Sequence, residues 1–193
     1  MNRFYCNFRI IYYEVQDIIF FNKQDYYFCK METKFEFRNI LAADNQIIAQ
    51  IIRESLIQYG GDKPGTAFYD YDTDHMFEAY QGKGELYLIA ESGGNVAGGC
   101  GIKQLKGGDP EFCELQKLYL SADKRGFGIG RKLVEKCLEF ASQSGYKQCY
   151  LETFPNMTEA INLYLKFGFE RLKAPLGSTG HCGCDIWMVK HLQ

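Results

Sequence analysis

The chain has 193 residues, a formal net charge of −2 and a sequence isoelectric point of about 6.0. This length predicts one domain, or one domain with an appendage. The small net charge argues against a surface that neutralises phosphates, so nucleic acid is not an expected partner.

Residues 1–30 hold about a third of the chain's Phe, Tyr and Trp side chains. Charged residues interrupt their apolar runs and no cleavage site of small residues follows, so we do not expect a signal peptide. Met31 opens a stretch typical of a domain start. We therefore predict an N-terminal extension over 1–30, a domain over 31–193 and a natural translation start at Met31. The alternative is a hairpin that covers a hydrophobic patch, and native peptides upstream of Met31 would favour it.

The first part of the domain has the pattern of a strand and two helices. Alternating apolar and polar residues over 34–38 predict a half-buried strand. Asp44 can cap the following helix, whose apolar residues recur at helical spacing until Gly60-Gly61. Gly, Pro and Asp predict a loop over 61–71, and a short second helix follows over 72–80.

Three strands are predicted next, over residues 85–91, 96–105 and 111–120. Ser92-Gly93-Gly94-Asn95 is typical of a hairpin turn between the first two. Glycines inside the second strand, at 98, 99 and 101, indicate a bulge or a close approach of another backbone.

The last third alternates helices and strands. Apolar periodicity predicts a helix from Ile129 that Gly145 ends. A second helix is predicted over 157–167, with Asn156 and Glu159 as a capping-box-like pair. Strands over 146–154, 169–172 and 185–191 complete the order βααβββαβαββ. We predict an α/β (α+β) domain with a mixed, mostly antiparallel central sheet and helices on both faces.

The eight cysteines are scattered, which argues against a disulfide framework and for a reducing cytoplasm. Only His181-Cys182-Gly183-Cys184 has metal-ligand spacing, and it lacks a second pair of ligands. We expect a turn into the last strand there, and no metal. No apolar run approaches the ~20 residues of a membrane helix, so a membrane partner is not expected either.

The segment most informative about function is ELQKLYLSADKRGFGIGR, residues 114–131, predicted as strand, loop and helix. Its glycines let backbone N–H groups approach an anion, and the first N–H groups of the helix lack internal partners. These features predict a pyrophosphate cradle, with Arg125 and Arg131 adding positive charge. No Gly-Lys-Ser/Thr closes a Walker A loop, and Arg131 replaces the third glycine of the dinucleotide fingerprint.

Arg125, Gly128 and Gly130 match the Arg/Gln-x-x-Gly-x-Gly/Ala signature of the GNAT N-acetyltransferase superfamily. The chain resembles this family from about Phe35 to its C-terminus, including AINLYLKFGF over residues 160–169. An ordinary glycine-rich turn is the alternative. The resemblance implies a GNAT-like fold that binds acetyl-CoA as co-substrate and transfers its acetyl group to an amine.

The resemblance also implies where acetyl-CoA would bind. In the family, two strands splay at a bulge in the fourth strand, and the pantetheine arm pairs with backbone there. The implied cofactor-binding residues are Leu118, Tyr119 and Leu120 for the arm and Arg125, Gly126, Phe127, Gly128, Ile129, Gly130 and Arg131 around the pyrophosphate. Met157 stands where many members have a cofactor-contacting asparagine, so that contact is not expected.

Two residues are candidates for catalysis. An amine with a pKa of about 10 must lose a proton before it attacks a thioester. Glu114 matches the family's acidic position on the fourth strand and would be the base, directly or through a water; a structural glutamate is the alternative. Tyr164 matches the position of the acid that protonates the leaving thiolate, with core packing as the alternative.

The acceptor is weakly specified. Residues 69–74, YDYDTD, would suit a cationic amine, although a solvated loop with capping aspartates is the favoured interpretation. His181 has a side chain suited to proton transfer, although a surface histidine is favoured. We expect an amine of a small molecule or peptide as acceptor, and a homodimer stays open.

The main prediction is a cytoplasmic acetyl-CoA-dependent N-acetyltransferase. One alternative is a non-catalytic acyl-CoA-binding or sensing module, in which Glu114 and Tyr164 serve only structure. The other is a protein-interaction domain that uses the aromatic residues 1–30 to bind a partner.

Overall fold

The computed structural model describes residues 34–193; the predicted extension and the start at Met31 lie outside the described residues. The elements in chain order are β1 (Glu36–Asn39), the short 3-10 helix η2 (Ala42–Asp44), α1 (Asn45–Gln58), α2 (Tyr71–Asp74), α3 (Met76–Ala79), β2 (Leu86–Ser92), β3 (Asn95–Gln104), β4 (Phe112–Leu120), η3 (Ala122–Lys124), α4 (Ile129–Gln143), β5 (Gln148–Thr153), α5 (Thr158–Lys166), β6 (Glu170–Arg171) and β7 (Ile186–His191). The predicted order is confirmed, except that the second helix is two single turns interrupted at His75. Across this described part, every helix is too short or too polar to span a bilayer.

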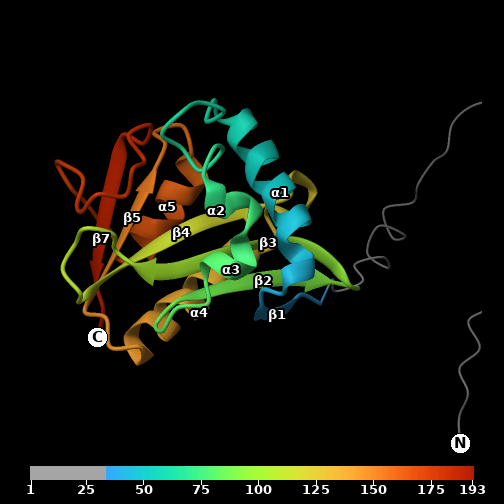
Figure 1. The fold of residues 1–193 in the computed structure, drawn as a ribbon, viewed down its shortest axis with the longest axis horizontal. Helices are drawn as coiled ribbons and strands as arrows, with labels where there is room; N and C mark the ends of the chain where they lie inside the picture. Colours follow the sequence, from blue (N-terminus) through green and yellow to red (C-terminus); the bar gives the residue numbers. More distant parts are fainter. Residues whose placement is uncertain (1–33) are drawn as a thin grey trace, which may run out of the picture. The chain divides into compact units, whose positions relative to one another are not determined.

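The seven strands form one sheet in the order β1-β2-β3-β4-β5-β7-β6 (Figure 1). All neighbouring strands are antiparallel except β4 and β5, which are parallel. A parallel pair requires a crossover connection, and α4 provides it. The predicted mixed, mostly antiparallel sheet is confirmed.

Helices cover both faces of the sheet, with α1, α2 and α3 on one side and α4 and α5 on the other (Figure 1). Strand β2 shows why its sequence is a nearly continuous apolar run. Tyr87 and Ile89 pack in the core with α1, whereas Leu88 and Ala90 pack in the core with α4. A strand buried on both faces needs apolar side chains at every position.

Both predicted helix caps are wrong, because each side chain has a more distant partner. Asp44 precedes α1, but its carboxylate accepts hydrogen bonds from Arg38 (2.6 and 3.0 Å) and from the backbone of Leu41 (2.8 Å). Asn156 donates its side-chain N–H to the carbonyl of Tyr59 (3.0 Å), and α5 begins after Met157.

Strand β4 contains the predicted bulge. Gly99 pairs with Tyr119 and Gly101 with Gln116, so β4 has one residue more than β3 between these pairs. Lys117 takes up the extra length at φ +50°, the only positive φ of a non-glycine residue among residues 34–193. Beyond Glu114, β4 no longer pairs with β5, and the two strands splay apart.

Glycines in β3 make room for two tyrosine rings that pack against each other. The rings of Tyr80 and Tyr87 are buried, tilted by 53°, with their centroids 5.1 Å apart. A Cβ on Gly101 would lie 2.5 Å from the Tyr80 ring and 2.7 Å from the Tyr87 ring. The Tyr87 hydroxyl donates to the carbonyl of Lys117 (3.0 Å), so this ring pair supports the bulge.

We expect Gly101→Ala to lower the free energy of unfolding by about 1–3 kcal/mol, because buried rings have no free space into which to move. Urea unfolding measures the change. Gly130→Ala is the matched control: its Cβ would meet nothing nearer than 3.7 Å, so its stability should not fall. Equal stability of the two variants would contradict the close packing described for β3.

Candidate active site

A cavity of about 590 Å³, called the large cavity below, lies between the end of β4, the start of α4 and α5. Nine of the ten predicted cofactor-binding residues line it: Leu118, Tyr119, Leu120, Arg125, Gly126, Gly128, Ile129, Gly130 and Arg131. The tenth, Phe127, does not; its side chain is exposed and its ring lies 6.3 Å from that of Phe35. Met157 also lines the cavity, at the position where many family members have asparagine.

The loop before α4 has the geometry of an anion cradle. Gly126 and Gly128 have φ of +83° and +79°, a left-handed conformation that favours glycine. The first intrahelical bond at this end runs from Lys132 to the carbonyl of Gly128 (3.1 Å), so the N–H groups of the three preceding residues have no helical partner. With Arg131 beside them, these groups fit a pyrophosphate.

Arg125 lines the large cavity and also binds neighbouring protein groups. Its guanidinium donates to the carbonyl of Leu120 (3.1 Å), to Gln58 (2.7 Å) and to Ser55 (3.0 Å). These three bonds tie α1 to the end of β4. Arg125 therefore fixes the wall of the large cavity and adds positive charge there.

Glu114 is buried, with 2% of its surface exposed. Its carboxylate accepts a hydrogen bond from Gln116 (2.6 Å), and Gln116 in turn accepts one from Tyr80 (2.9 Å). Burial raises the pKa of Glu114 to about 7; the Gln116 hydrogen bond and the charge of His181 oppose this rise, and the charge of Glu152 adds to it. A carboxyl group with this pKa exchanges protons at neutral pH.

Glu114 lines two smaller cavities. A polar cavity of about 250 Å³ also contacts Asp70, Lys103 and His181. A narrow cavity of about 40 Å³ also contacts Tyr119, which belongs to the large cavity as well. The three cavities therefore share walls, and Glu114 lies where the polar and narrow cavities meet.

Asp72 and Asp74 are about half exposed, but the predicted capping is wrong, because the side chain of Asp70 makes no cap hydrogen bond at the start of α2. Asp70 and Asp72 line the polar cavity as members of ion pairs and not as an open acidic wall. Each carboxylate has a cationic partner. The pairs are Asp70 with Lys117 (2.8 Å) and His181 (2.9 Å), Asp72 with Lys103 (3.3 Å) and Asp74 with Arg53 (2.7 Å). The polar cavity thus carries charges of both signs, which does not favour a polycation as acceptor.

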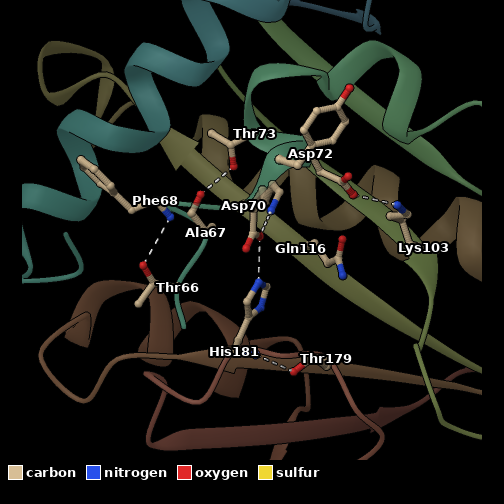
Figure 2. Close-up of polar contacts among 12 residues, drawn as sticks. Thr66, Ala67, Phe68, Asp70, Asp72, Thr73, Lys103, Gln116, Thr179 and His181 are labelled. Atoms are coloured by element: carbon tan, nitrogen blue, oxygen red, sulfur yellow. Dashed lines mark hydrogen bonds and ion pairs between the residues drawn. The ribbon is translucent and has the colours of Figure 1, made fainter. Parts of the chain in front are cut away.

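His181 is not the surface histidine that was favoured. Its side chain is 17% exposed and its Nε2 lies 2.9 Å from Oδ2 of Asp70, as Figure 2 shows. The hydrogen bond that His181 donates to the Asp70 carboxylate raises the pKa of His181. Burial alone would raise the pKa of Asp70, but His181 and Lys117 outweigh it and lower that pKa to about 2.

The expected turn after His181 is present: the N–H of Cys184 donates to the carbonyl of His181 (3.3 Å). Within residues 34–193, no group of three or more His, Cys, Asp or Glu side chains is placed to hold a metal ion. The ring of His181 is thus oriented by a carboxylate in a cavity that Glu114 also lines.

Tyr164 lies on the other side of the sheet from Glu114. Its ring packs edge-on against Phe169 (5.8 Å between centroids) in the same core as Leu115, whose neighbour Glu114 points the opposite way. Burial raises the pKa of the Tyr164 hydroxyl, so it stays protonated. The gap between β4 and β5 is where groups from the two faces can approach each other.

Comparisons with known proteins found similarity over most of the chain. The model of the Acetyltransferase (GNAT) family matches residues 45–169. The uncharacterized N-acetyltransferase YjgM of Escherichia coli (strain K12) is 40% identical over 157 residues, which are 80% of this chain and 93% of that protein.

Two solved structures share the fold. An acetyltransferase of the GNAT family from Staphylococcus aureus Mu50 has a TM-score of 0.72 at 17% identity, over 83% of this chain and 100% of that one. The protein yncA of Salmonella typhimurium, solved with its cofactor acetyl-CoA, has a TM-score of 0.66 at 22% identity, over 82% of this chain and 94% of that one.

The pKa of Glu114 predicts how stability depends on pH. Folding raises this pKa from 4.5 to about 7, so the folded state binds the proton more tightly than the unfolded state. The contribution of Glu114 to stability is therefore largest below pH 4.5 and falls as pH rises through about 7. We expect Glu114→Gln to remove about 2–3 kcal/mol of the fall seen between about pH 5 and 8 in urea unfolding.

Glu54→Gln, a change at a solvent-exposed glutamate, is the control and should keep the wild-type pH dependence. The same pH dependence in Glu114→Gln as in the wild type would show that Glu114 does not titrate as described.

Proposed function

The chain belongs to the acetyltransferase (GNAT) family, and from this premise we propose that it transfers an acetyl group from acetyl-CoA directly to an amine of a small molecule or peptide. The observation that carries the proposal is the place of Glu114. It is a buried carboxyl group with a pKa of about 7 that lines the polar and the narrow cavity, and Tyr119 links the latter to the large cavity.

The large cavity would hold acetyl-CoA, which supplies the thioester. The N–H groups at the start of α4 and the side chain of Arg131 would bind its pyrophosphate. Beyond Glu114 β4 no longer pairs with β5, so backbone groups of Leu118–Leu120 are free on that side and would pair with the pantetheine arm. A backbone N–H in this stretch would also polarise the thioester carbonyl.

Glu114 would act as the general base. The acceptor enters as an ammonium ion and must lose one proton before its nitrogen can attack the carbonyl carbon. A carboxyl group with a pKa of about 7 is partly ionised at neutral pH, and it can both accept this proton and release it to water. Gln116, fixed by the Tyr80 hydroxyl, would hold the carboxylate in place.

Tyr164 would act as the general acid. As the carbon–sulfur bond breaks, the departing thiolate gains a negative charge that a proton donor relieves. Because its pKa is raised, the hydroxyl is protonated at neutral pH and would have a proton to donate when the thiolate departs. Tyr164 itself does not line the large cavity, but its neighbour Leu163 on α5 does, and the hydroxyl would reach the sulfur from this helix.

Acetyl-CoA should stabilise the protein. Ligand at about 100 times its dissociation constant adds about 2.7 kcal/mol, which raises the melting temperature by about 5–10 °C for a domain of this size. NAD and ATP at the same concentration should produce no shift. We expect Gly128→Ala to weaken acetyl-CoA binding, because the side chain disfavours the left-handed backbone that presents the N–H groups.

Gly145→Ala is the matched control. Gly145 also has a left-handed backbone and open space around it, but it lies at the other end of α4. Its affinity for acetyl-CoA should equal that of the wild type. An equal loss in both variants would indicate general destabilisation and would argue against the cradle.

Replacing either proposed catalytic group should slow turnover while acetyl-CoA affinity is kept. We expect Glu114→Gln and Tyr164→Phe each to lower kcat by about 100-fold or more, followed as release of the CoA thiol with a panel of primary amines. In the wild type, kcat/KM should rise with pH through about 7, as Glu114 loses its proton.

Full turnover in Glu114→Gln would exclude it as the base. If the wild type binds acetyl-CoA but acetylates no amine in the panel, the non-catalytic acyl-CoA-binding module becomes the better proposal.

A further inference from the structure

Glu152 has a buried carboxylate oxygen without a partner. One oxygen, Oε1, accepts hydrogen bonds from the hydroxyls of Tyr150 and Thr179, both at 2.9 Å. The other, Oε2, is buried and has no hydrogen-bond partner within residues 34–193. A buried anionic oxygen without a donor is costly, so its position calls for a ligand.

Glu152 lines the narrow cavity that Glu114 also lines. The two side chains share a face of the sheet: Glu114 pairs with Tyr150 in parallel register, and Glu152 is two residues further along β5. A volume of about 40 Å³ is enough for one or two groups the size of water. The cationic head of a primary amine is such a group.

The ion pairs of the described residues leave Glu152 without a cation. The nearest positive side chains that line the same cavity, Lys117 and His181, are both paired with Asp70. Glu152 therefore offers a negatively charged oxygen, in a carboxylate held by the hydroxyls of Tyr150 and Thr179. No cationic side chain among residues 34–193 pairs with it.

We propose that Glu152 binds the ammonium group of the acceptor through Oε2 and holds it against Glu114. This assignment rests on the proposed function and deepens it. The two carboxylates have separate roles: Glu152 attracts the cation, and Glu114 removes its proton. The same site selects a primary amine over an alcohol of equal shape, because a hydroxyl does not neutralise the buried charge.

Butylammonium chloride is a suitable probe, with 1-butanol as its uncharged counterpart. By calorimetric titration at neutral pH, the wild type should bind butylammonium at least about tenfold more tightly than 1-butanol. Glu152→Gln should lose this preference, because the amide keeps the contacts of Oε1 but not the charge. Affinity for acetyl-CoA should stay within about twofold of the wild type.

Thr179→Val is the matched control. It removes one contact to Oε1 and keeps the charge of Glu152, so the preference for butylammonium should survive. In Glu152→Gln, the fall in stability that Glu114 causes should also move to lower pH, since Glu114 loses an anionic neighbour. That shift checks only that Glu152 carries its charge beside Glu114; a structural role for Glu152 predicts no change in the preference for butylammonium.

Equal binding of butylammonium by the wild type and Glu152→Gln would overturn the assignment. If Glu152→Gln does not fold, the titrations of the wild type still test the assignment. Equal affinity of the wild type for butylammonium and 1-butanol would also overturn it. Turnover is not used in these titrations. Absence of acetyl transfer would therefore count against the proposed function but not against the ammonium site. If the enzyme is active but shows no preference for butylammonium, the ammonium site is wrong and the proposed function is unaffected.

Discussion

The left-handed backbone at Lys117 is the constraint on which the site depends. It accommodates one extra residue in β4, and the Tyr87 hydroxyl donates a hydrogen bond to the Lys117 carbonyl. The ring of Tyr87 fits only because β3 has glycine opposite it. Beyond Glu114, which precedes the bulge, β4 no longer pairs with β5, and the end of β4 forms a wall of the large cavity. Gly101 in β3 thus leaves space for the ring of Tyr87 in β2, and the hydroxyl of Tyr87 holds the bulge at Lys117 in β4.

The same bulge organises the electrostatics. It directs the Lys117 side chain to Asp70, which also binds His181, so three segments far apart in sequence are joined by one carboxylate. At Asp70 these two partners outweigh burial and lower the pKa to about 2, whereas at Glu114 burial dominates and raises the pKa to about 7. Burial has opposite outcomes for the two acids because one has cationic partners and the other has an amide and an anionic neighbour.

Local patterns in the sequence predicted what is local in the structure. Apolar periodicity located the helices and strands, and the glycine spacing located the cradle before α4, because these features arise from residues adjacent in the chain. The failures involve distant partners. Asp44 binds Arg38 instead of capping α1, and Asp70 meets His181 across 111 positions. The spacing of residues along the chain cannot predict such a contact. Each residue alone was interpreted locally, Asp70 as a capping aspartate and His181 as a surface histidine.

The two halves of the site differ in how they are built, and this difference explains why the acceptor is harder to infer than the cofactor. The cradle uses backbone N–H groups at a helix start, a geometry that only the glycines specify. The acceptor side uses side chains from loops, including Asp70, Thr179 and His181, and the last two lie beyond the residues 45–169 that match the family. Loop side chains vary without disturbing the sheet. Membership of the family therefore carries information about acetyl-CoA, whereas the acceptor must be inferred from the charges of this chain alone.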